Sequence, residues 1–186
     1  MRHRVFIAIN LPEGIKKQLA DCRTKWLELP ARWTKKENLH ITLIFLSYLS
    51  DQELLEVCQA VKEVVLKQKS FLINLTRICY GPPKKMPPRI VWAEGDKSQE
   101  FSGLRQGLSN YFSPEERAFS PHITLARIKT WEWKKIEPEE RPEVEEEIDL
   151  SFEVNSIEVM ESDLKKTGPE YTILESFPFG INNTNK

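Results

Sequence analysis

The sequence predicts a fold of mixed strands and helices, built from two copies of one unit. The tetrapeptide His-Ile-Thr-Leu occurs twice, at residues 40–43 and 122–125, about half the chain length apart. A predicted strand and a predicted helix precede each copy, so the order strand, helix, motif strand is repeated. We expect a single bilobal domain over residues 1–186, with the first copy at about 4–80 and the second at about 88–179. A pseudo-twofold axis would bring their equivalent strands face to face.

The first copy opens with RVFIAIN at residues 4–10, a β-branched and aromatic run typical of a buried strand. A helix is expected over about 12–29, because apolar residues recur at helical spacing and proline suits a first turn. The motif strand HITLIFL follows at 40–46. A capping-box pattern from Ser50 then starts a second helix. FLINLTRICY, at 71–80, predicts a third strand.

The second copy repeats that order. RIVWAEG at 89–95 predicts a strand, the apolar spacing over 98–112 predicts a helix, and HITLARI at 122–128 is the second motif strand. The acidic, proline-broken stretch EPEERPEVEEE at 137–147 is expected to be a solvated loop. FEVNSIEVM and YTILESFPF should finish the chain as strands, with a turn between them at the Gly-Pro pair that begins with Gly168.

The composition describes a globular protein, because 40% of the residues are hydrophobic and 30% are charged. The formal net charge of −1 gives no overall basic field, so any binding of RNA must be local. Three scattered cysteines favour a reducing compartment over a disulfide framework. Neither a secretory signal nor a membrane-spanning apolar run is recognised, and we expect a cytoplasmic monomer.

Alternation along a strand decides what each motif exposes. His40 and Thr42 share one face of the first motif strand, and His122 and Thr124 share one face of the second. Across a groove, two imidazoles and two hydroxyls could hold a phosphate. Since the ordinary pKa of histidine is about 6.5, one neutral imidazole can take a proton from water while the other, protonated, gives one to the leaving oxygen.

A structural explanation competes with this one. A single histidine on a strand is more often structural, and threonine is simply a good strand former; the matching places of the two copies favour function. Zinc is the competing chemistry, but no Asp, Glu or Cys accompanies either motif at short spacing, and zinc sites need three or four protein ligands. We therefore expect no metal. We also expect His3 to be incidental, and parity with His40 assigns Phe45 to the core.

Similar stretches run along nearly the whole chain, from Val5 to Phe179: RVFIAINLP, ENLHITLIFL, PPRIVWAEG, SPHITLARIK and ESDLKKTGPEYTILESFPF. Together they resemble the 2H phosphoesterase superfamily, and within it the RNA 2′,3′-cyclic phosphodiesterases, also called 2′-5′ RNA ligases. The resemblance implies an α+β fold of two similar lobes, each an antiparallel sheet with helices on the outside, and an active-site groove between them. It implies hydrolysis of RNA 2′,3′-cyclic phosphate ends to 2′-phosphates without metal or cofactor. The joining of tRNA halves through a 2′-5′ linkage would be the reverse direction of similar chemistry.

The family's functional residues carry over by this resemblance. His40 and His122 would be the catalytic pair, with His122 as the base for water and His40 as the acid toward the leaving 3′ oxygen. Thr42 and Thr124 would bind the substrate phosphate. Arg127 matches a common family arginine that could also meet the phosphate. Simple alternation puts Arg127 on the face opposite His122, so contact with the phosphate needs a twist or a bulge in the strand. The alternative, on which the sequence places equal weight, is that Arg127 points to the outer face of the sheet.

Three points stay open at this level. Ser47 stands where family members often carry glycine after the first motif. The loop from Lys84 to Arg89 gathers basic residues that either touch an RNA backbone or are simply solvated. The expected partner is an RNA or nucleotide with a 2′,3′-cyclic phosphate end, including tRNA fragments. The alternatives are a phosphodiesterase for small cyclic nucleotides or 2′-5′ oligoadenylates, and a non-catalytic protein that binds RNA ends.

Overall fold

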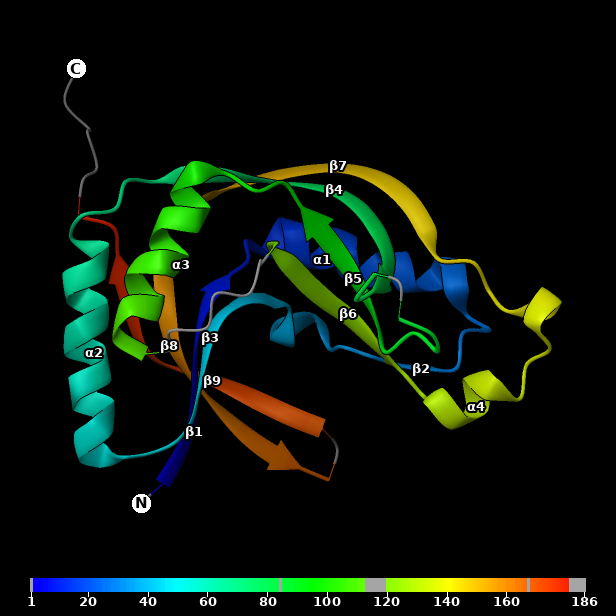
Figure 1. The fold of residues 1–186 in the computed structure, drawn as a ribbon, viewed down its shortest axis with the longest axis horizontal. Helices are drawn as coiled ribbons and strands as arrows, with labels where there is room; N and C mark the ends of the chain where they lie inside the picture. Colours follow the sequence, from blue (N-terminus) through cyan, green and yellow to red (C-terminus); the bar gives the residue numbers. More distant parts are fainter. Residues whose placement is uncertain (1, 84, 113–119, 167, 181–186) are drawn as a thin grey trace.

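The computed structural model describes residues 2–83, 85–112, 120–166 and 168–180. Within these ranges, nine strands form one antiparallel sheet in the order β7-β4-β5-β6-β3-β1-β8-β9, with β2 paired to β6 (Figure 1). The strands are β1 (Arg2–Asn10), β2 (Ala31–Trp33), β3 (His40–Ser50), β4 (Phe71–Gly81), β5 (Ile90–Gly95), β6 (His122–Ile128), β7 (Glu145–Val154), β8 (Ser156–Lys165) and β9 (Gly168–Pro178). The helical segments are α1 (Glu13–Asp21), α2 (Asp51–Val65), α3 (Gln99–Phe112) and α4 (Thr130–Lys134), with 3₁₀ turns η1 (Cys22–Trp26), η2 (Lys36–Asn38) and η3 (Pro138–Glu140). The predicted α+β class is confirmed.

Apart from the short β2, the sheet consists of two four-stranded halves that meet at the motif strands. One half runs β3-β1-β8-β9 and the other runs β6-β5-β4-β7, and the pair Ile41 and Ile123 joins them. In each half, the motif strand lies at the junction and the first strand of the same sequence copy lies next to it: β1 beside β3, and β5 beside β6. A pseudo-twofold axis at the junction requires this equivalent order. The outer strands are exchanged: β4 lies beside β5 and β7, whereas β8, near the chain's end, lies beside β1 (Figure 1). The boundaries of the two sequence copies stay a prediction.

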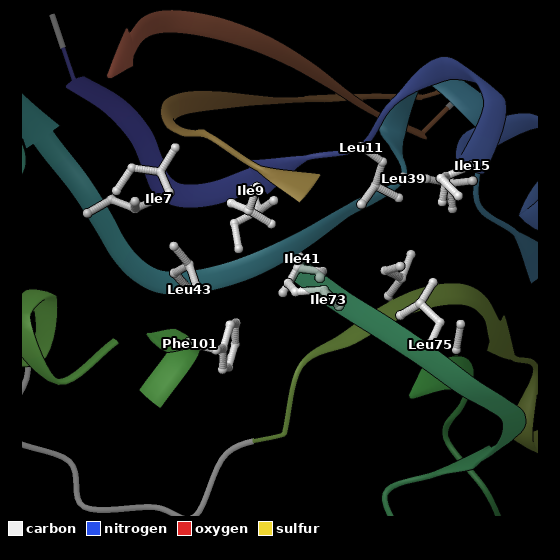
Figure 2. Packing of buried hydrophobic residues seen from close by; sticks show 14 of the residues in the cluster. Ile7, Ile9, Leu11, Ile15, Leu39, Ile41, Leu43, Ile73, Leu75 and Phe101 are labelled. Carbon is white, nitrogen blue, oxygen red and sulfur yellow. The ribbon is translucent and has the colours of Figure 1, made fainter. Parts of the chain in front are cut away.

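One cluster of buried apolar side chains includes residues from both halves of the sheet. Figure 2 shows part of this cluster, including Ile7 and Ile9 from β1, Ile41 and Leu43 from β3, and Ile73 and Leu75 from β4. The helices add their apolar stripes to the same core, chiefly through Ile15 and Leu19 of α1, Val57 and Val61 of α2, and Phe101 and Leu104 of α3. This shared core holds the two motif strands in fixed positions.

Specific side-chain interactions fix the positions of the helical segments. The capping box at the start of α2 is confirmed, because Ser50 Oγ accepts the Glu53 N–H at 3.3 Å and the Glu53 carboxylate accepts the Ser50 N–H at 2.7 Å. α2 lies alongside α3, where a Cβ on Gly107 would sit 3.1 Å from Val64 (Figure 1). η1 reaches toward the far edge of the sheet, where Trp26 Nε1 donates to the Glu143 carbonyl at 3.0 Å.

The acidic stretch at 137–147 is only partly a loop, and the prediction is wrong at its end. β7 begins at Glu145 and pairs with β4 along the edge of the sheet. An edge strand can leave one face in solvent, so charged residues alternate there with apolar ones such as Ile148 and Phe152. The run of acidic residues concealed that alternation. The short elements β2 and α4 were also missed.

The predicted strand FEVNSIEVM is in fact divided between β7 and β8. The chain leaves one half of the sheet for the other at Asn155, between the two strands. β8 and β9 then form a hairpin that projects from the sheet (Figure 1). Gly168 is the first residue of β9 rather than part of a turn outside it, and its φ of 122° favours glycine.

Among the residues that the structure describes, no helix is long and apolar enough to cross a membrane.

Candidate active site

The junction of the two motif strands brings the motif side chains together. Ile41 and Ile123 are directly paired in antiparallel register, so His40 lies beside Thr124 and Thr42 beside His122. Residues opposite each other in such a pair have Cβ atoms about 4.5–5.5 Å apart. The isoleucines are fully buried below, and the four polar side chains lie at the groove above. The structure therefore brings all four predicted residues into one site.

Both imidazoles are held by the backbone in the same way. Nδ1 of His40 lies 2.7 Å from the Asn38 carbonyl oxygen, and Nδ1 of His122 lies 3.0 Å from the Ser120 carbonyl oxygen. A carbonyl can only accept, so Nδ1 carries the proton in each neutral ring and Nε2 keeps its lone pair. Nε2 of His40 lies 2.9 Å from Thr42 Oγ1, whose hydroxyl donates to it. In each histidine the backbone carbonyl thus fixes the same tautomer, with the lone pair on Nε2.

Aromatic rings surround the imidazoles and limit their access to water. The His40 ring lies 5.0 Å from the ring of Phe6 and meets Tyr171 edge-on at 5.1 Å. The His122 ring lies 4.5 Å from the ring of Trp92. Packing of this kind fixes the ring orientations and removes solvent from the charged forms of the histidines.

The electrostatic surroundings of the two histidines differ. Burial lowers the pKa of His40; the Asn38 carbonyl opposes the shift, while Lys16 and His122 lower the pKa further. Lys16 is itself buried, and its Nζ donates to the Glu37 carbonyl at 3.4 Å. Both histidines therefore favour the neutral form, since burial also lowers the pKa of His122. For His122 the shift is opposed by the Ser120 carbonyl and by the negative charge of Glu94.

The first motif strand contains a bulge that changes which side chains face the groove. The register of β1 with β3 shifts between the pairs Ile7–Ile44 and Ala8–Thr42, which leaves Leu43 as an extra residue. Leu43 and Ile44 are consequently both buried, and Phe45 turns to the face of His40. The prediction that Phe45 belongs to the core is wrong, because its side chain is 73% exposed and lines the groove.

The second motif strand has the same bulge at the equivalent place. The register of β5 with β6 shifts between Val91–Ala126 and Trp92–Thr124, so that Leu125 and Ala126 are both buried. Arg127 therefore turns to the face of His122 and lines the groove. This is the bulge that a phosphate contact by Arg127 required. Phe45 and Arg127 occupy corresponding positions, five residues after their histidines.

A groove of about 1000 Å³ contains the motif residues and Arg127. Sequence reasoning missed other residues of its wall, notably Arg4 of β1, Arg32 and Trp33 of β2, and Tyr171 of β9, because these strands are far apart in the sequence and share no pattern. Arg4 and Tyr171 lie in stretches that carried the family resemblance, whereas Arg32 and Trp33 do not.

The structure places Ser47 and the basic loop differently with respect to the groove. Ser47 lines the groove with a φ of 66°, the left-handed conformation that suits glycine. In the basic loop, Lys84 lies outside the described residues, while Lys85 and Arg89 are exposed and are not part of the groove wall. Over the described part of the chain, no three His, Cys, Asp or Glu side chains gather as metal ligands would.

Comparison with known sequences places this geometry in a family. The model described as LigT like phosphoesterase matches residues 9–92 and 95–171, and each segment contains one motif. The RNA 2′,3′-cyclic phosphodiesterase of Thermotoga maritima is 32% identical over 185 residues, which is 95% of each chain. The enzyme of that name from Methanocaldococcus jannaschii is 29% identical over 178 residues, 94% of this chain and 99% of the relative.

Solved structures agree on the fold. A crystal structure of the protein TT0787 from Thermus thermophilus superposes with a TM-score of 0.79 at 27% identity, covering 95% of this chain and 98% of that one. Escherichia coli LigT complexed with 3′-AMP has the same fold, with a TM-score of 0.77 at 23% identity over 96% of this chain and 99% of that one. With the family match extending over most of its length, the chain belongs to the LigT-like phosphoesterase family.

Proposed function

We propose that the chain hydrolyses the 2′,3′-cyclic phosphate at the 3′ end of an RNA to a 2′-phosphate, with His40 and His122 as an acid–base pair. The observation that carries the proposal is the pairing of Ile41 with Ile123, around which two identically held imidazoles and two threonine hydroxyls share one groove. The names of the relatives from Thermotoga maritima and Methanocaldococcus jannaschii support the choice of substrate.

The reaction needs two proton transfers. A water molecule attacks the phosphorus as one histidine takes its proton, and the P–O3′ bond breaks as the other histidine protonates the leaving O3′. The products are a 2′-phosphate and a free 3′-hydroxyl. Thr42 and Thr124 can donate to the non-bridging oxygens, and Arg127 can balance the charge that develops on them. General acid–base steps contribute about 10²–10⁴-fold each.

The order of the two roles is a separate proposal. The family resemblance suggests His122 as base and His40 as acid. In the free protein burial lowers the pKa of both histidines; Lys16 adds to the shift of His40, and Glu94 opposes that of His122. A substrate with sulfur in place of O3′ distinguishes the two orders, since a thiolate leaves without protonation. Replacement of the general acid by alanine should slow the oxygen substrate but spare the sulfur substrate, whereas replacement of the base should slow both.

Ligation would use the same groups. If the 5′-hydroxyl of a second RNA replaced water, its attack on the cyclic phosphate and loss of O3′ would leave a 2′-5′ phosphodiester. We include the joining of tRNA halves in the proposal as this variant of the reaction.

A small cyclic nucleotide would fill only part of a groove of about 1000 Å³, whereas an RNA end could extend along it. This favours RNA over the alternative small substrates. A protein that only binds RNA ends would have no need for two equivalent histidines with lowered pKa values.

The direct test is incubation of an RNA oligonucleotide ending in 2′,3′-cyclic phosphate with the protein in EDTA. We expect a 2′-phosphate product, identified by mass and by comparison with authentic 2′- and 3′-phosphate ends. A 3′-phosphate product, or no turnover of oligonucleotides alongside turnover of mononucleotides, would contradict the proposal.

A further inference from the structure

The charged side chains that line the groove are all basic. They are Arg4, Arg32, Lys35, Arg105 and Arg127, and no Asp or Glu is among the described residues of the groove wall. The chain as a whole has 28 acidic and 27 basic residues, so this separation of charge is local to the groove. Basic side chains thus line the groove beyond the motif residues and Arg127.

Two of these cations lie directly opposite each other. β2 pairs with the second part of β6, and the register places Arg32 opposite Arg127. Like charges directly opposite each other on neighbouring strands repel. Both residues are exposed and both line the groove. One anion in the groove could therefore lie close to both guanidinium groups.

The residues around Arg32 leave space for its side chain beside the groove. A Cβ on Gly168, at the start of β9, would overlap the Arg32 guanidinium, so the hairpin leaves room for it there. The hairpin is tied to η2 by Asn38, whose Nδ2 donates to the Pro169 carbonyl at 2.8 Å. Trp33 and Lys35 follow Arg32 along the same wall. Neighbouring strands are about 4.8 Å apart, so Arg32 lies one strand beyond the arginine nearest the motifs.

We propose that Arg32, with Lys35, binds the phosphodiester immediately 5′ to the reacting nucleotide. The inference rests on the proposed function, because a 2′,3′-cyclic phosphate ends its chain and every further phosphate lies on the 5′ side. The ligand class is an oligoribonucleotide with at least one internal phosphodiester. The subsite selects RNA ends over mononucleotides through charge, without reading base sequence.

The experiment compares three substrates: a mononucleotide 2′,3′-cyclic phosphate, the corresponding dinucleotide, and the same dinucleotide with an uncharged methylphosphonate linkage. For the wild-type protein, we expect kcat/KM to be about tenfold higher for the charged dinucleotide than for the other two, as one charge-assisted contact would give. Arg32→Gln should reduce the ratio of charged dinucleotide to mononucleotide at least fivefold. It should also weaken the salt dependence for the dinucleotide, because one phosphate contact is lost.

Arg23→Gln is the matched control, since Arg23 is exposed on η1 and is not part of the groove wall; it should leave the ratio unchanged. Equal kcat/KM for the charged and methylphosphonate dinucleotides would overturn the inference, because any advantage would then come from base stacking. An unchanged ratio in Arg32→Gln would overturn it as well.

A second measurement separates failure of the proposed hydrolysis from failure of the proposed subsite. If the wild-type protein hydrolyses none of the three substrates, calorimetric binding of a 2′-phosphorylated dinucleotide still tests the subsite. Tighter binding of the charged than the methylphosphonate form, lost in Arg32→Gln, would support the subsite without the reaction. Equal binding of both forms would exclude it.

Discussion

Asn38 lies just before the first motif strand and connects it to the β8–β9 hairpin, and Asn38→Ala tests that connection. The side chain is 7% exposed, and Nδ2 donates to the Pro169 carbonyl at 2.8 Å. The backbone carbonyl of Asn38 accepts from His40 Nδ1 and is retained in the variant. The substitution therefore releases the hairpin without removing the hydrogen bond that orients His40.

The magnitude follows from the lost hydrogen bond. A net hydrogen bond contributes about 1 kcal/mol, and leaving a buried acceptor unsatisfied costs about 1–3 kcal/mol. Pro169 lies at the groove, where water can partly replace the amide, so we expect a loss of about 1–2 kcal/mol in the free energy of unfolding. For a chain of this size, that corresponds to a decrease in Tm of roughly 2–8 °C.

The release should also reach the active site. Tyr171 follows Pro169 in β9 and packs edge-on against His40. With the hairpin loosened, His40 becomes better hydrated, and its lowered pKa should rise toward the ordinary value. NMR titration of the His40 ring protons measures this shift, which a purely structural role elsewhere would not produce.

Chemical denaturation of wild type, Asn38→Ala and a control gives the stability. Asn110→Ala is the control, because Asn110 is exposed and its side chain bonds only Gln106 one turn away, at 2.9 Å, among the contacts described; we expect a loss below about 0.5 kcal/mol. If Asn38→Ala lost no more stability than the control and left the His40 titration unchanged, the reasoning would be refuted.

Three further predictions concern other parts of the molecule. Ser47→Gly should stabilise the protein by about 0.5–1 kcal/mol, since its φ of 66° strains an L-residue by more than glycine loses in chain entropy, whereas Ser47→Val should destabilise it; a stabilised valine variant would contradict this. His3 bonds two carboxylates that raise its pKa, Asp51 at 2.8 Å and Glu161 at 2.7 Å. Its contribution to stability should be full below about pH 6.5 and lost as pH rises through the higher folded value, so the difference in unfolding free energy between wild type and His3→Gln should shrink from pH 6 to 9. Because both active-site pKa values are lowered, kcat/KM should follow a bell with its maximum below about pH 6.5; a rate that rises steadily from pH 5 to 9 would argue against the pair.

The motif residues could be predicted because they lie before the bulges. Alternation holds from His40 to Leu43 and from His122 to Leu125, and the burial of these residues follows it. One residue later the register shifts, and in both strands the alternation rule then assigns side chains to the wrong face. Phe45 was therefore assigned to the wrong face, and the side of Arg127 could not be decided. A bulge adds a residue without any composition signal, so a single sequence does not reveal it.

The remaining differences arise from tertiary pairing. The groove wall combines Arg32, Asn38 and Tyr171 from separate segments, and their meeting depends on how the hairpin docks. β7 was hidden by acidic residues that an edge strand tolerates, and the exchange of outer strands between halves leaves no local pattern. His3 was predicted to be incidental, but it bridges β8 and the start of α2.

The central claim is that the two motifs form one catalytic site, in which His40 and His122 act together as an acid–base pair. The most direct measurement is kcat/KM for an RNA 2′,3′-cyclic phosphate end, in EDTA, with wild type, His40→Ala, His122→Ala and the double variant. We expect each single variant to lose about 10²–10⁴-fold and the double variant to lose little more, because the groups act as a unit. Near-wild-type turnover in either single variant would contradict the account.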